Sequence, residues 1–272
     1  MARDGLHDND GHMIWLVQLA FDCHDPDAIT AFWGRLLDYD SELAHQTPEE
    51  VARFRADHPQ FDGRGRIDDR LLRRMPVYIQ RVPEPKVTTN RVRLEVAVPA
   101  DDGSPAGEHS DPEGNEYRVV VDPSVPTRRL SSIMFDALDP KGQAAFWATA
   151  TGYTLDQTGT RCNPPVSELT WTGQSFSHPS APDRDLFHVT GSGAAHGPAP
   201  YDLIPAFAFS KNDQPKTTKN RIHVDLCSTD ALADRERLVE LGATILHWNG
   251  DQVLADPEGN EFCLGGRSRP RD

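Results

Sequence analysis

Apolar and polar side chains alternate along the segment Trp15–Phe21, which is the pattern of a strand with one buried face. An Asp-Pro pair follows this strand, and proline suits the first turn of a helix. The next residues place Phe32, Trp33, Leu36 and Leu37 at helical spacing. The stretch therefore predicts an amphipathic helix whose aromatic side chains lie in the core.

The same succession of patterns occurs twice along the 272 residues. Three collinear matches indicate a tandem duplication. We expect one domain over residues 14–122 and a second over residues 130–266, joined by a linker at Asp122–Arg129. The matching pairs are Phe21–Tyr39 with Phe135–Tyr153, Pro85–Val96 with Pro215–Leu226, and Asp111–Val119 with Asp256–Leu264.

Both copies predict two further strands. The first of these is Asn90–Val98 in copy one and Asn220–Cys227 in copy two. An Asp-Pro-Glu-Gly turn then leads into a last strand, Asn115–Val121 or Asn260–Leu264. Each copy is thus predicted to be an α+β unit.

The two copies differ between these strands. Copy two predicts a helix over Ala231–Leu241, ended by Gly242, and then strands over Thr244–His247 and Gln252–Ala255. Copy one has only the segment Pro99–Ser110 at this place, and its Asp, Gly and Pro residues favour a loop. The second half of copy one is therefore expected to be reduced.

Copy one has an insertion of its own at residues 44–76. A Thr-Pro-Glu-Glu sequence that begins at Thr47 is a capping box with proline at the first helical position, so it predicts a helix to about His58. A second helical segment is predicted near Asp68–Arg74.

Composition narrows the range of partners. The formal net charge of −14 argues against nucleic acid, whose binding needs a basic surface. No apolar run reaches the length of a membrane span, and Met1–His12 lacks the features of a signal peptide. We therefore expect a cytoplasmic protein with neither a nucleic-acid nor a membrane partner.

The repeated segments, with the Leu-Gly-Ala-Thr sequence of copy two, resemble the glyoxalase-like branch of the vicinal-oxygen-chelate superfamily, which includes bleomycin-resistance proteins and extradiol dioxygenases. The resemblance covers nearly the whole chain. It implies an α+β fold of tandem domains, each made of paired βαβββ modules that curl into a cup-shaped mixed sheet. It also implies that metal-dependent members hold a divalent ion in the cup, with residues from the first and last strands of each module.

Alternation along the strands of copy two directs a set of polar residues into its predicted cup. His223 and Asp225 share one face of their strand, and Glu261 and Cys263 share the corresponding face of the last strand. Asp136 of the first strand is expected to join this set. We expect His223, Glu261 and Cys263 to ligate a metal, and Glu261 or Asp225 to transfer a proton.

The predicted substrate pocket lies in the same cup of copy two. It would consist of Ser132, which falls at the first-strand ligand position, together with Asp136 and an apolar wall of Phe207 and Phe209.

Copy one diverges at the ligand positions. Arg93 stands where copy two has His223, and its permanent charge would repel a cation. We therefore expect copy one to be a metal-free partner whose cup is closed by Arg–carboxylate pairs, and copy two to carry the activity. Gln18 falls where some metal-binding relatives place a ligand.

Three functions follow from these patterns. The first, which we favour, is an enzyme of the lyase, isomerase or dioxygenase type that uses one divalent ion (Fe, Mn, Ni or Zn) to polarise neighbouring oxygens of a small substrate. The second is a metal-free binder of small molecules, as in drug-sequestering relatives. The third is a structural protein whose cups are filled by side chains. The chain is expected to be a monomer or a homodimer.

Overall fold

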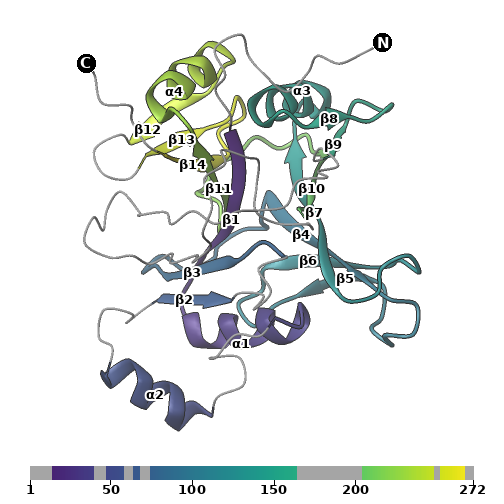
Figure 1. Ribbon diagram of the computed structural model, residues 1–272, viewed down its shortest axis with the longest axis vertical. Coiled ribbons are helices and arrows are strands. Elements are labelled where there is room, and N and C mark those ends of the chain that lie inside the picture. The colour runs from purple at the N-terminus through teal and green to yellow at the C-terminus, as the bar shows by residue number, and fades with distance from the viewer. Residues whose placement is uncertain are drawn as a thin grey trace, which may run out of the picture.

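The computed structural model describes residues 14–39, 47–57, 64–67, 74–163, 204–247 and 252–266 (Figure 1). Copy one contains β1 (Ile14–Cys23), α1 (Pro26–Leu36), α2 (Pro48–Asp57), β2 (Arg64–Ile67), β3 (Val77–Arg81), β4 (Val92–Val98), β5 (Gly107–Ser110) and β6 (Glu116–Val121). Copy two contains β7 (Arg129–Ala137), α3 (Pro140–Thr151), β8 (Thr154–Leu155), β9 (Arg161–Asn163), β10 (Ala206–Lys211), β11 (Ile222–Ser228), α4 (Ala231–Glu240), β12 (Thr244–His247), β13 (Val253–Ala255) and β14 (Glu261–Gly266).

Local sequence signals set the helix ends. The Asp25 carboxylate accepts hydrogen bonds from the amides of Asp27 and Ala28, so it caps α1. The capping box of α2 is confirmed, since the Thr47 amide donates to Glu50 Oε2 at 2.7 Å and the Glu50 amide donates to Thr47 Oγ1 at 3.3 Å.

The expected difference between the copies is confirmed in outline, with one correction. Helix α4 is followed by Gly242, which adopts the left-handed conformation with a φ of 107°. At the equivalent place of copy one, residues 99–106 contain turns and no helix. The segment Pro99–Ser110 is not entirely a loop, because its last residues form β5, which pairs antiparallel with β6. The helical segment predicted near Asp68–Arg74 lies outside the described residues, apart from Arg74.

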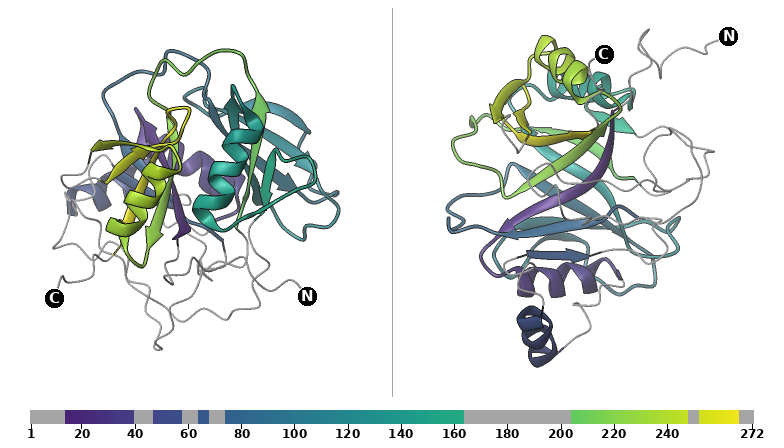
Figure 2. Two further views of the ribbon diagram at one scale, coloured as in Figure 1. Left: turned by 90° about the horizontal axis from the view of Figure 1, so that it is seen from above. Right: turned by 60° about the vertical axis from the view of Figure 1, so that its left-hand side comes forward.

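The strands form two seven-stranded mixed sheets, and each sheet takes strands from both copies. Sheet I has the order β12-β13-β14-β11-β1-β3-β2, and sheet II has the order β5-β6-β4-β7-β10-β9-β8. The expectation that the modules pair within a copy is therefore wrong. The antiparallel pairs β1–β11 and β4–β7 instead join copy one to copy two at the centre of each sheet (Figure 2).

The packing of the apolar cores explains why strands pair between the copies. In copy one, the Trp33 ring lies 5.2 Å from Phe21 of sheet I and 5.2 Å from Tyr117 of sheet II. In copy two, the Trp147 ring lies 5.1 Å from Phe207 of sheet II and 5.2 Å from Phe262 of sheet I. The two modules of one copy are thus packed face to face around their aromatic residues, so their strand edges are left to pair with the other copy.

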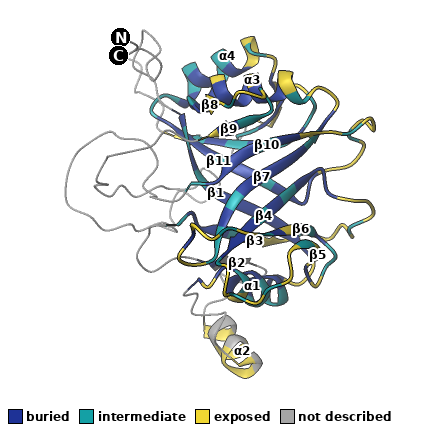
Figure 3. Cartoon of the chain, turned by 90° about the vertical axis from the view of Figure 1, so that its right-hand side faces the viewer, coloured by how far each residue is buried: buried dark blue, intermediate teal, exposed yellow. Residues whose placement is uncertain are grey.

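Helix α1 lies at the opposite end of the molecule from α3 and α4 (Figure 1). The strands between them are mostly buried, as the dark blue ribbons of Figure 3 show. Burial of one large aromatic or aliphatic side chain contributes roughly 1.5–3 kcal/mol, so these cores provide much of the driving force for folding.

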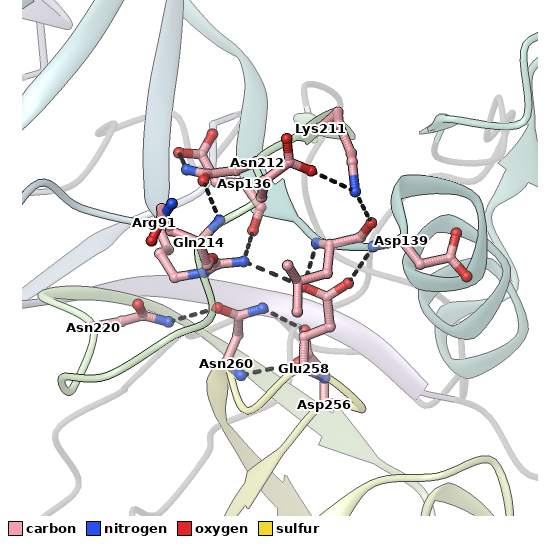
Figure 4. A network of polar contacts seen from close by, with 12 residues as sticks. Arg91, Asp136, Asp139, Lys211, Asn212, Gln214, Asn220, Asp256, Glu258 and Asn260 are labelled. Carbon is pink, nitrogen blue, oxygen red and sulfur yellow. Dashed lines mark hydrogen bonds and ion pairs between the residues drawn. The ribbon is translucent and has the colours of Figure 1, made fainter.

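The Asp-Pro-Glu-Gly turn of copy two connects the two sheets (Figure 4). Asp256 accepts hydrogen bonds from the indole of Trp147 at 3.2 Å and from the Asn260 side chain at 2.9 Å. Glu258 accepts from the amides of Leu138 and Asp139, each at 2.7 Å. The Glu258 carboxylate also pairs with Arg91 of copy one at 3.2 Å.

Removal of this acceptor should destabilise the protein. We expect Glu258→Ala to lower the free energy of unfolding by about 2–4 kcal/mol, because two backbone N–H groups lose their acceptor and a largely buried guanidinium loses its carboxylate partner. Urea unfolding followed by circular dichroism measures the change. Glu236→Ala is the matched control, since its side chain is 73% exposed and its ion pair contributes little. Equal losses in the two variants would contradict the role given to Glu258.

Candidate metal site in sheet I

Three strands of sheet I bring polar side chains together on the face opposite the cores. Across the β1–β11 seam, Gln18 lies opposite Asp225 and the small Ala20 lies opposite His223. On the other side of β11, Asp225 lies beside Cys263 of β14. The site therefore combines one residue of copy one with three residues of copy two.

The donor atoms of this group are close to one another. His223 Nε2 lies 3.4 Å from Asp225 Oδ1, and Gln18 Nε2 donates to Asp225 Oδ2 at 2.5 Å. One ligand atom each from His223, Asp225 and Cys263 lies within 4.8 Å of the others. We call these three residues the metal trio.

Burial shapes the electrostatics of the trio. It lowers the pKa of His223 below the ordinary value of 6.5, and the carboxylate of Asp225 opposes this shift only in part. The imidazole is therefore neutral near pH 7, which is the form that ligates a metal. Asp225 Oδ1 is buried and has no hydrogen-bond partner among the residues that the structure describes.

The lowered pKa of the largely buried His223 predicts a pH dependence of stability. Between its lowered pKa and 6.5, the unfolded chain binds a proton that the folded protein does not bind. The free energy of unfolding should therefore fall as the pH decreases below the ordinary histidine value, and His223→Asn should make this fall shallower. Urea unfolding of both proteins from about pH 7.5 to about pH 5 tests this sign. A steeper fall in the variant would be the wrong result for a depressed pKa.

Glu261, predicted as a metal ligand or proton donor, has hydrogen bonds to both of its carboxylate oxygens. Its Oε1 accepts from Lys216 Nζ at 2.6 Å, and its Oε2 accepts from the Asn220 amide at 3.2 Å. The equivalent residue of copy one, Glu116, accepts from a lysine and an asparagine amide in the same way. A contact present in both copies is explained by the fold, so these bonds hold the loop before β11 and occupy both Glu261 oxygens.

Two residues of the expected pocket lie in the other sheet, because β7 pairs with β4 and β10. Ser132 is buried, and its Oγ donates to Glu95 at 3.0 Å. Asp136 accepts from Arg93 at 2.6 Å and from Asn212 at 3.0 Å. Ser132 and Asp136 therefore belong to the polar face of sheet II and do not join the metal trio.

The expected apolar wall is also placed elsewhere. Phe207 is fully buried and stacks on Tyr153 with 5.1 Å between the ring centroids. Phe209 stacks on Phe135 at 5.1 Å. Both side chains point into the core of copy two, because the polar face of β10 is formed by the alternate residues.

The sequence predicts Gln18 at a ligand position of the first strand, but in the cup of copy one. The cross-copy seam puts it beside the trio, where the expected pairing had put Ser132.

The donor set fits a transition metal. An imidazole nitrogen, a thiolate sulfur and a carboxylate oxygen together favour Zn²⁺ or Fe²⁺ over the hard ions Mg²⁺ and Ca²⁺. Asp225 Oδ1, a buried oxygen with no hydrogen-bond donor among the described residues, is the kind of acceptor that a cation satisfies.

Comparisons with known proteins agree with this architecture. A family model described as a glyoxalase-like domain matches residues 18–110 and 132–265. No curated protein matches the sequence at a significant level.

No described helix has both the length and the apolar character that crossing a membrane requires.

Solved structures of glyoxalase I show the same fold at low identity. Glyoxalase I from Zea mays is similar over 94% of this chain and 93% of that chain, with 13% identity and a TM-score of 0.54. A mutant of this enzyme aligns with the same coverage and identity and a TM-score of 0.56. A weaker likeness, with a TM-score of 0.28 and 13% identity, covers 94% of this chain and 91% of 2,2',3-trihydroxybiphenyl 1,2-dioxygenase from the dibenzofuran-degrading Sphingomonas wittichii strain RW1.

Two mixed sheets, each assembled from paired modules, define a protein with the vicinal-oxygen-chelate fold. Since the family model spans most of the sequence, the chain belongs to the glyoxalase-like domain family of that superfamily.

Proposed function

We propose that this protein is an enzyme that binds one divalent metal ion at the metal trio and acts on a small organic molecule with neighbouring oxygen atoms. The observation that carries the proposal is the convergence of His223, Asp225 and Cys263 within 4.8 Å, with Asp225 Oδ1 buried and without a hydrogen-bond partner among the described residues. Membership of the glyoxalase-like family supports the class of substrate.

In this proposal the trio holds the ion, and the ion would supply Lewis-acid polarisation of the substrate oxygens. Gln18 positions the site, because its bond to Oδ2 fixes the orientation of the Asp225 carboxylate. Ala20 lies opposite His223 across the seam, so the side chain that neighbours the imidazole there is a small one.

Asp225 is the carboxylate that we propose to exchange a proton with the substrate. Both oxygens of Glu261 already accept hydrogen bonds from Lys216 and Asn220, and loss of either bond would release the loop before β11. Among the described residues, Asp225 Oδ2 accepts from Gln18 alone, so this oxygen keeps a lone pair with which it can also accept a substrate hydroxyl.

Metal content tests the proposal. Protein purified without a chelator should contain close to one Fe, Mn, Ni or Zn per chain by elemental analysis. His223→Ala should lose at least about 90% of it, since the loss of a ligand reduces affinity by well over tenfold. His247→Ala is the control, because His247 is an exposed histidine of β12. Metal-free protein that none of these ions stabilises against heat would overturn the proposal, and ligand binding indifferent to chelators would favour a metal-free binder.

The thiol gives an independent test. Protein loaded with Co²⁺ should show a thiolate-to-cobalt charge-transfer band in the near ultraviolet if Cys263 is a ligand. Cys263→Ser should remove this band. Cys227→Ser should retain it, because burial raises the pKa of Cys227 to about 12 and keeps it a thiol. A band that survives in Cys263→Ser would remove the cysteine from the ligand set.

A further inference from the structure

The polar face of sheet II is formed by strands equivalent to those of the candidate metal site, but it carries different side chains. The repeat places Arg93 of β4 at the position of His223, and Arg118 of β6 at the position of Cys263. Both side chains lie on the polar face, because Arg118 is paired with Glu95, two residues along β4 from Arg93. Two cationic groups thus stand where sheet I has metal-binding groups.

The two guanidinium groups are incompletely paired. Arg93 Nη2 bonds to Asp136 at 2.6 Å, but its Nε is buried and has no partner among the described residues. Arg118 is about half exposed, and its Nε lies 4.0 Å from Glu108. Arg93 Nη1 and Arg118 Nε, whose contacts with Glu108 are 3.9 and 4.0 Å long, therefore retain donor capacity toward the polar face.

The carboxylate of Glu108 in β5 lies near both arginines. Its two carboxylate oxygens lie 3.9 Å from Arg93 Nη1 and 4.0 Å from Arg118 Nε. Both distances are too long for hydrogen bonds, and the Glu108 side chain is 59% exposed. In sheet I the corresponding residue, paired with Cys263, is the apolar Val253. A weakly held carboxylate of the protein itself therefore lies between two arginines.

We propose that the polar face of sheet II is a second ligand site, in which Arg93 and Arg118 bind the carboxylate group of a small organic anion after it displaces Glu108. A free carboxylate can approach both guanidinium groups at hydrogen-bonding distance, which Glu108 does not do from its strand. A planar guanidinium can donate two hydrogen bonds to the two oxygens of one carboxylate, which a spherical anion cannot accept in the same way. This site is independent of the proposed metal site, since it shares none of its side chains.

Isothermal titration with benzoate tests the proposal, and neutral benzamide is the matched probe of the same shape. Benzoate should bind the full-length protein and benzamide should not. Glu108→Gln should strengthen benzoate binding roughly three- to tenfold, because it removes the competing charge. Arg93→Gln and Arg118→Gln should each weaken it at least about tenfold.

Controls make each outcome decisive. Arg35→Gln, an exposed arginine of α1, should bind benzoate like the unmodified protein. Arg118→Gln remains informative if Arg93→Gln fails to fold, because Arg118 is half exposed. Chelation of metal should change nothing, which separates this test from that of the metal site. The proposal is overturned if benzoate does not bind, if benzamide binds as well, if inorganic phosphate alone binds, or if Glu108→Gln weakens binding.

Discussion

The antiparallel pairing of β1 with β11 determines which residues make up the candidate metal site. Its register places Gln18 opposite Asp225 and Ala20 opposite His223. Because side chains alternate along a strand, a slip of one residue would turn His223 and Asp225 into the apolar core. The core residues of the same strand, Val224 and Leu226, resist that slip, since they are almost completely buried. Packing of the core face of β11 therefore fixes His223 and Asp225 on its polar face.

The same seam depends on how each copy packs. The Trp33 indole donates to Asp111 at 3.1 Å, and the Trp147 indole donates to Asp256 at 3.2 Å. Each bond links a helix to the Asp-Pro-Glu-Gly turn of its own copy, in addition to the aromatic contacts. Cores are thus formed within copies and sheets are formed between copies. A duplicated chain satisfies both requirements at once, because it supplies the partner edges in the same molecule.

Much of the local structure could be predicted from sequence, because its causes are local. Proline, capping residues and Gly242 set helix ends within a few positions, and strand alternation correctly grouped His223, Asp225 and Cys263. The strand pairing could not be predicted in this way. Both copies have nearly the same strand patterns, so alternation fits either partner for β11 equally well. The choice depends on long-range packing, and for that reason the sequence suggested Ser132 where the structure has Gln18.

This exchange changes how the duplication is related to function. Copy two was expected to carry the activity and copy one to be its partner, but each polar face draws residues from both copies. Both sheets keep an equivalent Lys–Glu pair beside the polar face, Lys216 with Glu261 on sheet I and Lys86 with Glu116 on sheet II. The polar side chains next to these pairs differ, because sheet I has the metal trio and sheet II has two arginines. Neither copy contains a whole polar face, so the two sheets, and not the two copies, are the units whose side chains diverged. A substitution in β1 of copy one therefore alters the same site as a substitution in β11 of copy two.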